Sequence, residues 1–247
     1  MDLVKDVQVL LDDRPQVAAI LGLTSFADFP HLAGGLFTYL CKSEVIGRTV
    51  RSTYASDARL VETTLYDIAE TARRNFEPGG PPVTLLFSRG VHAIMAHRVA
   101  HQLWQGRDFN LALAIKAACG RVFATDIHPA ATIGKGLWLD HGLGFVVGET
   151  AVIEDDVSIW HNVTLGSTLT DSGPRRHPHV KTGAVIGAGA ILLGGITIGA
   201  NANVAAGSIV LDDVPDDTVA VGSKAKLRGP ARVAFANPNP NPKGTIR

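Results

Sequence analysis

Residues 180–210 read VKTGAVIGAGAILLGGITIGANANVAAGSIV, and an aliphatic side chain returns at every sixth position of this stretch. The same period organises the longer segment from Ile127 to Pro215, in three phased blocks. The leading residues are Ile127, Ile133 and Leu139 in the first block, Val147, Ile153, Ile159 and Leu165 in the second, and Val180, Ile186, Leu192, Ile198, Val204 and Val210 in the third. A period of six fits neither a 3.6-residue helix nor an alternating strand. It predicts a solenoid in which each hexapeptide forms one short flat side and turns a corner, with the leading side chain inside.

The period is interrupted at two places, and a regular solenoid is expected to carry its polar functional residues there. The first interruption is a step of eight residues around His141-Gly142. The second is the aperiodic stretch from Gly166 to His179, which contains Arg175-Arg176-His177-Pro178. A solenoid has no deep internal pocket. A ligand is therefore expected in a groove beside the coils, walled by the protruding loops and often by a second subunit.

One candidate for acid–base chemistry combines Asp126, at the start of the coil region, with His141 in the first interruption. If one coil takes three hexapeptides, about eighteen residues, these two side chains lie on successive coils. A histidine oriented by a carboxylate is a familiar general base, because the acid fixes the tautomer and stabilises the imidazolium. Asp and His also serve as corner residues in such coils, so the spacing alone leaves both roles open.

The composition excludes some classes of partner. The 247-residue chain has 23 Lys and Arg against 23 Asp and Glu, which gives no support for general attraction to nucleic acid or to an anionic membrane. No apolar run reaches membrane-spanning length and no secretion signal opens the chain, so we expect a soluble, cytoplasmic protein. Cys41 and Cys119 stand far apart in sequence and match no metal or redox spacing, which favours reduced, buried thiols.

The chain ahead of the coils, up to about residue 122, has the apolar spacing of helices. We expect helices within residues 7–11, 43–75, 85–105 and 110–118, with a break at Glu77-Pro78-Gly79-Gly80-Pro81-Pro82. They are interpreted as a bundle that caps the coils and mediates oligomerisation. His97 and His101 fall on adjacent turns, but no acidic or Cys partner is near in sequence, so packing roles are favoured and no metal site is predicted.

A set of short motifs runs through both parts of the chain, from about residue 45 to 229. They are Gly90-Val91-His92-Ala93, His97-Arg98, His101-Gln102-Leu103-Trp104, Asp126-Ile127-His128-Pro129-Ala130-Ala131, Leu139-Asp140-His141, Val146-Val147-Gly148-Glu149-Thr150-Ala151-Val152-Ile153, Asp156-Val157-Ser158-Ile159, Val163-Thr164-Leu165-Gly166, Arg176-His177-Pro178 and Ile186-Gly187-Ala188-Gly189-Ala190. With these motifs the chain resembles the serine O-acetyltransferases, hexapeptide-repeat enzymes that make O-acetylserine for cysteine biosynthesis. A generic hexapeptide acyltransferase would share the repeat but not this set.

The resemblance implies an α+β fold in three parts. Residues 1–122 are expected to form a helical oligomerisation or cap domain, and residues 123–229 a left-handed parallel β-helix of hexapeptide repeats that carries the catalytic site. Residues 230–247, with the repeated Asn-Pro of residues 237–242, are expected to form a flexible tail, because this low-complexity segment cannot bury enough apolar surface to order itself.

The resemblance also implies a reaction, the direct attack of a serine hydroxyl on the thioester of acetyl-CoA. This is the chemistry of an acetyl-CoA-dependent O-acetyltransferase (EC 2.3.1 class). His141 corresponds to the general base and Asp126 to its partner. Asp140 corresponds to a residue that contacts the substrate amino acid, and Arg176 and His177 to residues that hold it at its carboxylate. A neutral imidazole must accept the hydroxyl proton, because a serine hydroxyl is a poor nucleophile at neutral pH.

Acetyl-CoA is implied to lie in a groove between the coils of two subunits of a homotrimer. Such trimers either stand alone or pair into a hexamer, a dimer of trimers, through their helical domains. Small residues would let the pantetheine arm approach the backbone closely, and lysines would meet the nucleotide phosphates. The corresponding positions are Gly166, Ser167, Thr168, Gly187, Ala188, Gly189, Ala205, Ala206, Lys224 and Lys226.

Two departures from the family pattern bear on specificity and partners. The family has an Asp-Pro pair after an arginine at the end of a helix, and its Asp helps to bind the substrate. Here the segment is Arg74-Asn75-Phe76-Glu77-Pro78, so either Asn75 takes that position or Glu77 reaches it by a local shift. Many members end in an isoleucine that docks into O-acetylserine sulfhydrylase. This chain ends Thr245-Ile246-Arg247, so weak or absent binding to that enzyme is expected.

Three other functions compete with serine acetylation. The first is acetylation of another hydroxyl acceptor, such as homoserine or a sugar. The second is a non-catalytic scaffold, against which the Asp126 and His141 pair argues. The third is a γ-type carbonic anhydrase, which needs three zinc-binding histidines across a subunit interface. The candidates His128, His141, His161 and His177 do not show that spacing clearly.

Overall fold

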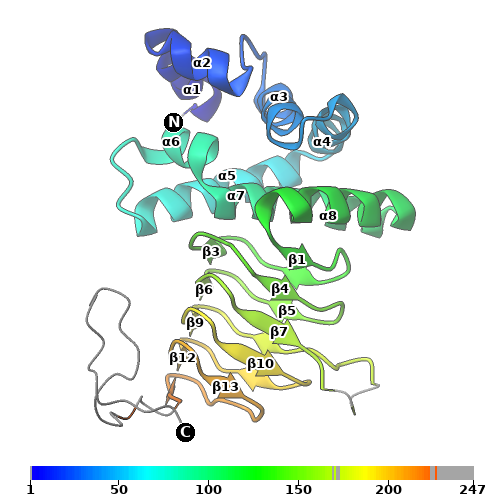
Figure 1. The fold of residues 1–247 in the computed structure, drawn as a ribbon, viewed down its shortest axis with the longest axis vertical. Helices are drawn as coiled ribbons and strands as arrows, with labels where there is room; N and C mark the ends of the chain where they lie inside the picture. The colour runs from blue at the N-terminus through cyan, green and yellow to red at the C-terminus, as the bar shows by residue number, and fades with distance from the viewer. Residues whose placement is uncertain (1, 169, 171–172, 223–225, 227–247) are drawn as a thin grey trace, which may run out of the picture.

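The computed structural model describes residues 2–168, 170, 173–222 and 226. It has two tiers, in which helices α1 to α8 lie above a stack of short coils and the chain passes from helices to coils once (Figure 1). Helices α7 and α8 run along the top of the coil stack. The expected tail, residues 230–247, and the expected phosphate contact Lys224 lie outside the described residues.

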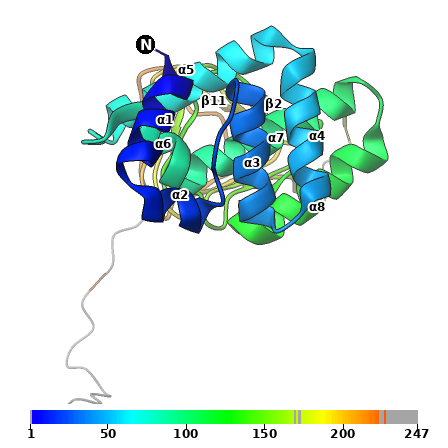
Figure 2. The same ribbon diagram turned by 90° about the horizontal axis from the view of Figure 1, so that it is seen from above.

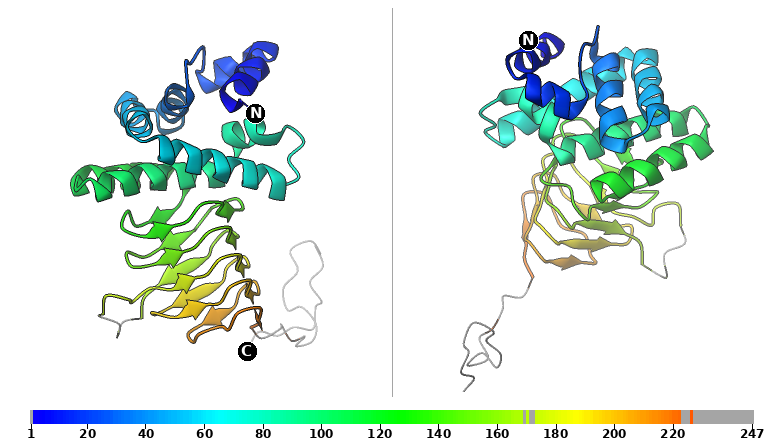
Figure 3. Two further views of the ribbon diagram at one scale, coloured as in Figure 1. Left: turned by 180° about the vertical axis from the view of Figure 1, so that it is seen from behind. Right: turned by 45° about the horizontal axis from the view of Figure 1, so that its top comes forward.

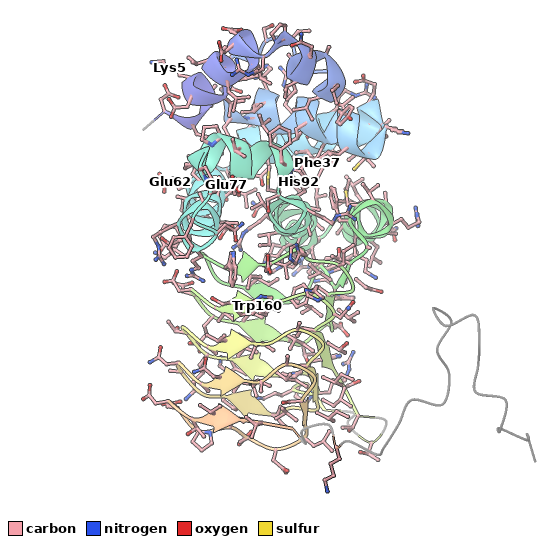
Figure 4. The ribbon with its side chains drawn as sticks, turned by 60° about the vertical axis from the view of Figure 1, so that its left-hand side comes forward. Lys5, Phe37, Glu62, Glu77, His92 and Trp160 are labelled. Carbon is pink, nitrogen blue, oxygen red and sulfur yellow. The ribbon has the colours of Figure 1, made fainter. Side chains whose placement is uncertain are left out.

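The helical tier forms two groups around α7. Helices α3 and α4 lie side by side, and α1 and α2 lie near α6 (Figure 2). The helices of the described residues are α1 (Leu3–Asp13), α2 (Pro15–Leu21), α3 (Phe29–Cys41), α4 (Glu44–Ser56), α5 (Ala58–Arg74), α6 (Gly80–Phe87), α7 (Arg89–Gln105) and α8 (Phe109–Phe123). Phe37 of α3 and His92 of α7 both pack against Phe123, which ties these three helices together (Figure 4).

Short polar side chains set the helix boundaries. Asp57 ends α4 and begins α5, because its carboxylate accepts a hydrogen bond from the backbone N–H of Arg59. The Ser88 hydroxyl likewise accepts from the Val91 N–H and begins α7. Two of the expected helices, residues 43–75 and 85–105, are therefore each divided in two. The apolar period continued across both caps, which is why the sequence pattern missed these breaks. The pattern also missed α2 and α3 entirely. The expected break at residues 77–82 is shorter than predicted, because α6 begins at Gly80 and takes the two prolines into its first turn.

The coils are made of short parallel strands that form three sheets. Their bounds are β1 (Asp126–Ile127), β2 (Thr132–Ile133), β3 (Trp138–Leu139), β4 (Val146–Val147), β5 (Val152–Ile153), β6 (Ser158–Ile159), β7 (Thr164–Gly166), β8 (His179–Val180), β9 (Val185–Ile186), β10 (Ile191–Leu193), β11 (Thr197–Ile198), β12 (Asn203–Val204), β13 (Ile209–Val210) and β14 (Val219–Ala220). Each strand from β1 to β10 pairs with the third strand further along the chain, and β12 pairs with β14. Successive hexapeptides therefore occupy three different sides of the stack.

The strand register confirms the predicted period. Along one side the leading residues Ile127, Val147, Leu165, Leu192 and Val210 are paired in turn, and all five are buried. Val147 and Leu165 are eighteen positions apart, which is one coil of three hexapeptides. Ile127 and Val147 are twenty apart, so the two-residue insertion is confirmed. Between β7 and β8 the chain leaves the stack as a side loop, and the next coil resumes in the same register (Figure 3).

A buried ion pair joins the two tiers. Arg98 of α7 donates to the carboxylate of Asp67 of α5 and to the backbone carbonyls of Ile133 and Gly134 in the first coil, at 2.6–3.2 Å. The Asp67 carboxylate also accepts from the backbone N–H of Gly136, at 2.6 Å. Both side chains are almost fully buried. This network holds α5 and α7 in place over the first coil.

Cys41 and Cys119 are both free, and the fold brings them together although they are far apart in sequence. Their Sγ atoms are 3.8 Å apart, where α3 ends beside α8. The expectation of buried thiols holds for Cys119, whereas Cys41 is only half-buried. The helices of the described residues lack the combined length and hydropathy of a membrane span.

Candidate functional site

An open pocket of about 460 Å³ lies at the junction of the two tiers. Asn75, Glu77 and Arg89 line it from the helical side, and Asp140 and His141 line it from the first coil. Figure 4 shows Glu77 at the base of α6, above the coils. The pocket therefore brings together residues more than sixty positions apart in sequence, including two that the motifs single out.

His141 stands in the loop made by the two-residue insertion. Its backbone has φ 61°, in the left-handed region that His adopts more readily than most residues, and Gly142 follows with φ 74°. The side chain is 65% exposed, and its Nε2 lies 3.3 Å from a carboxylate oxygen of Asp140. The His161 ring of the next coil lies 5.6 Å from it, centroid to centroid. The insertion thus presents an accessible imidazole beside a carboxylate.

The start of α7 packs unusually closely on this loop. A Cβ atom at Gly90 would lie 1.9 Å from the backbone carbonyl oxygen of Leu139. Only glycine fits there, which gives the Gly90 motif of the sequence a structural reason. The close approach places Arg89 at the edge of the pocket that contains His141.

The segment after α5 decides which polar side chains enter the pocket. The N–H of Phe76 donates to the carbonyl of Arg73, the N–H of Glu77 donates to the carbonyl of Ala72, and Phe76 has φ 50°. This is the hydrogen-bond pattern of a Schellman motif, formed here without glycine. It turns the chain so that Asn75 and Glu77 both line the pocket.

Asn75 and Glu77 differ in what remains available to a ligand. The side-chain oxygen of Asn75 accepts a hydrogen bond from the indole N–H of Trp138, at 2.8 Å. The carboxylate of Glu77 has no hydrogen bond or ion pair to another described residue. Of these two residues, Glu77 therefore offers the ionisable group with no partner among the described residues.

Asp126 lies apart from His141 within this single chain. It begins β1, its side chain is 61% exposed, and its carboxylate pairs with the ammonium of Lys116 of α8. Within the described residues no hydrogen bond or ion pair joins Asp126 to His141. The expected pairing of these two residues therefore remains a prediction.

A second polar cluster surrounds the described part of the side loop. The guanidinium of Arg176 pairs with the carboxylate of Glu149 at 2.5 Å, and this contact holds the pKa of Glu149 below its usual range. His177 is buried, and its Nδ1 accepts from the backbone N–H of Thr150 at 3.2 Å. Burial, and then the charge of Arg176, lower the pKa of His177, so this ring is neutral at pH 7. Its Nε2 then carries the proton and is a hydrogen-bond donor.

Glu149 and Thr150 were not singled out by the sequence analysis, although both fall within a matched motif. The hydroxyl of Thr150 accepts from the backbone N–H groups of Arg176 and His177, both at 3.2 Å, and so holds the loop against the coil. Nothing in the hexapeptide period distinguishes these residues from ordinary corner residues.

The small residues expected to contact acetyl-CoA fall into two sets. Gly187, Ala188, Ala205 and Ala206 line a shallow groove of about 390 Å³ that also includes Trp160, whose ring packs edge-on against Trp138. The other set, Gly166, Ser167 and Thr168, ends β7 and enters the side loop. Gly189 and Lys226 do not line this groove, and Lys226 is exposed. Trp160 is labelled on the coil stack in Figure 4.

Gly187 has a structural reason that the sequence analysis did not give. A Cβ atom there would lie 2.5 Å from the backbone nitrogen of Ala206 in the next coil. Close stacking of coils therefore requires this glycine, whether or not a ligand approaches it. The expectation that it admits a pantetheine arm stays a prediction.

Histidines elsewhere have packing roles, as expected. The Nδ1 of His101 is 2.7 Å from the carbonyl of Pro129, and His128 packs its ring against Trp104. His97 is buried, and burial lowers its pKa well below the usual value. No group of three or more His, Cys, Asp or Glu in the described part of the chain could hold a metal ion.

Comparison with known proteins places this arrangement in context. No protein-family model matches the chain. The serine acetyltransferase of Salmonella typhimurium is 42% identical over 198 residues, which are 80% of this chain and 72% of that protein. A truncated serine acetyltransferase apoenzyme of known structure has a TM-score of 0.82 at 34% identity, covering 91% of this chain and 96% of that one. The Brucella abortus serine acetyltransferase in complex with coenzyme A has a TM-score of 0.79 at 33% identity, covering 91% and 92%.

Proposed function

This chain belongs to the serine acetyltransferase family, and we propose that it transfers the acetyl group of acetyl-CoA to the hydroxyl of L-serine. The observation that carries the proposal is the accessible His141 imidazole, held in the inserted loop beside Asp140 and facing an open pocket. In this proposal the coils wind in the left-handed sense of the family's β-helix. The products are O-acetylserine and free CoA, and O-acetylserine is a precursor for cysteine biosynthesis.

His141 acts as the general base. As the serine oxygen attacks the thioester carbonyl carbon, its proton passes to the neutral imidazole. The tetrahedral intermediate then collapses with cleavage of the carbon–sulfur bond. The departing CoA sulfur takes the proton back from the imidazolium, so the residue is restored at the end of each turnover.

The serine substrate is held by its two charged groups. The carboxylates of Asp140 and Glu77 line the same pocket and suit the ammonium group. We assign to Glu77 the role of the family's acidic residue after the arginine, which helps to bind the substrate. Asn75 is a neutral contact beside it, because the side-chain oxygen of Asn75 already accepts a hydrogen bond from Trp138. Arg176 and the Nε2 proton of His177 suit the substrate carboxylate.

The two polar clusters are joined by assembly. In one chain, Arg176 and His177 contact Glu149 and Thr150 on the side-loop face, whereas Asp140 and His141 line the tier junction. We propose that a homotrimer, alone or paired into a hexamer through the helical tier, brings these clusters of adjacent subunits together. Asp126 would then meet His141 in the same arrangement and orient its ring.

Acetyl-CoA is assigned to the shallow groove beside Gly187, Ala188, Ala205 and Ala206. The bound coenzyme A of the Brucella abortus relative supports this class of ligand. The residues Gly166, Ser167, Thr168 and Gly189 border the same face in this proposal, and Lys226 is an exposed cation near the end of the stack.

A thiol-release assay tests the reaction. Purified protein is given acetyl-CoA with L-serine, homoserine or a simple sugar, and free CoA is measured. Serine is expected to give the largest kcat/KM, and His141→Ala to lower kcat about 10²–10⁴-fold, as for loss of a general base. His31→Ala, which changes a histidine of α3 remote from the pocket, serves as the control. Release with homoserine alone, or a His141→Ala enzyme with more than a tenth of normal kcat, contradicts the proposal.

Mixed oligomers test the shared site. Two inactive variants, His141→Ala and Arg176→Ala, are unfolded together, refolded and assayed. If each site takes His141 from one subunit and Arg176 from the next, about a quarter of the sites regain both residues in a random mixture of a cyclic oligomer. Mixtures that stay as inactive as the separate variants contradict the intersubunit site but not the acetyl transfer itself.

A further inference from the structure

The helical tier contains a pair of thiols at which two helices meet. Cys41 is the last residue of α3, and Cys119 lies in the third turn of α8, 78 residues further along the chain. Their Sγ atoms are 3.8 Å apart. Cys41 is half-buried and Cys119 is buried. A small oxidant can therefore reach the first sulfur, and the second lies directly behind it.

The geometry permits the two sulfurs to bond. A disulfide has a sulfur–sulfur distance of about 2.05 Å, so the pair must close by about 1.8 Å. Cys41 is at a helix end, where Lys42 has left-handed backbone angles and terminates α3. Movement there disturbs no further turn of α3. The neighbouring Cys119 thiol also lowers the pKa of Cys41 by hydrogen bonding, which favours Cys41 as the attacking thiolate.

We propose that Cys41 and Cys119 form a reversible intrachain disulfide in response to peroxides. The Cys41 thiolate attacks a peroxide oxygen, cleaves the O–O bond, and becomes a sulfenic acid as water or an alcohol leaves. The Cys119 sulfur then attacks the Cys41 sulfur and displaces water, while the Cys119 thiol proton goes to the leaving oxygen. The two thiols lose two electrons and two protons in total, and the peroxide gains them. A small dithiol reverses the change by thiol–disulfide exchange.

The disulfide site is coupled to the start of the coil stack through α8. Lys116, one turn before Cys119, pairs with Asp126. Gly120, the next residue, accepts from the backbone N–H of Thr125 at 3.0 Å through its carbonyl oxygen. A shift of this turn towards Cys41 therefore moves the ion pair of Asp126 and the hydrogen bond that holds the residue before it. This part of the inference depends on the proposed function, in which Asp126 orients the general base.

Disulfide mapping tests the bond itself, without reference to activity. The full-length protein is treated with dilute hydrogen peroxide, the remaining thiols are blocked, and proteolytic peptides are analysed by mass spectrometry. We expect one linked peptide pair that contains Cys41 and Cys119, a mass loss of two hydrogens per chain, and reversal by dithiothreitol. The linked protein is also expected to unfold about 5–10 °C higher, because the bond closes a long loop. Two free thiols after treatment, or links only between separate chains, overturn the proposal.

Cys41→Ser is the matched variant, because the half-buried helix end accommodates a hydroxyl. In this variant peroxide is expected to yield no intrachain link. In the wild type, the linked form is expected to have kcat lowered at least two-fold, with recovery on reduction, whereas peroxide leaves kcat of Cys41→Ser unchanged. A mapped disulfide with unchanged kcat overturns the coupling to Asp126. A protein that forms the disulfide but never releases CoA contradicts the proposed function instead, so the two failures are distinguishable.

Discussion

Replacement of Arg98 by methionine tests the network that holds the helical tier on the first coil. Arg98→Met keeps most of the apolar stem but removes the guanidinium that contacts Asp67 and the carbonyls of Ile133 and Gly134. Removing one partner of a buried ion pair typically costs about 3–5 kcal/mol, since the other charge is left without compensation. We expect a loss in this range, because Asp67 and Arg98 side chains are only 2% and 8% exposed.

The measurement is the free energy of unfolding from urea titration at a fixed protein concentration, followed by far-UV circular dichroism. Arg73→Met is the control, because Arg73 makes an ion pair with Glu70 on the surface, with the Arg73 side chain 66% exposed. Exposed pairs contribute about 0–1 kcal/mol. A similar loss of unfolding free energy in both variants would mean that burial does not determine how much the ion pair contributes to stability.

A double variant separates the unpaired charge from lost packing. Asp67→Asn in the Arg98→Met background removes the second charge, and its amide oxygen still accepts from the Gly136 N–H. We expect it to recover about 2 kcal/mol relative to Arg98→Met alone. Burial raises the pKa of Asp67, and Arg98 opposes that effect. The single variant should therefore lose less stability at pH 5 than at pH 8, where the stranded carboxylate is charged. A loss under 1 kcal/mol, or no recovery in the double variant, would refute the reasoning.

Two further predictions concern Glu77 and His92. Glu77→Gln is expected to raise the KM for serine about 10-fold with little change in the KM for acetyl-CoA, because one charge-assisted contact to the ammonium is lost. Glu62→Gln, at an exposed position of α5, is the control. An unchanged KM for serine in Glu77→Gln would reject the role of Glu77. Burial lowers the pKa of His92 to about 4, so the unfolded chain binds a proton more readily than the folded protein. The contribution of His92 to stability should be complete above pH 6.5 and fall by up to about 3 kcal/mol as the pH drops towards 4. His92→Gln should reduce the pH dependence in urea titrations at pH 7 and pH 5, with the remainder due to His97, whose pKa is also lowered. An equal dependence in both proteins would contradict the assignment.

The coil stack is the part of this protein that the sequence alone determined. Each hexapeptide contains an aliphatic residue that is stable only when buried inside the stack. The pairing of Val147 with Leu165 follows from that local period. The same period revealed the insertion that presents His141, because a local departure is visible against a strict repeat. The motifs then singled out Asp140 and His141, and the structure shows that both line one pocket.

The helices were predicted less well, because their boundaries depend on single caps within continuous apolar patterns. Asp57 and Ser88 each divide a predicted helix by one hydrogen bond from a side chain to the backbone. Neither residue stands out from other polar residues in the sequence. The apolar pattern predicts that these residues are helical, but the capping residue determines where one helix ends and the next begins.

Only the tertiary structure decided which distant residues meet. Arg98 pairs with Asp67, which is 31 positions away in sequence, and Cys41 lies beside Cys119, which is 78 positions away. Asp126 pairs with Lys116 of α8 and not with His141 of its own chain. These contacts depend on how the helical tier is rotated over the first coil, and that rotation is set by many packing contacts together. No local period encodes it. The repeat therefore specifies the scaffold, whereas the placement of charges and thiols on it belongs to the folded molecule.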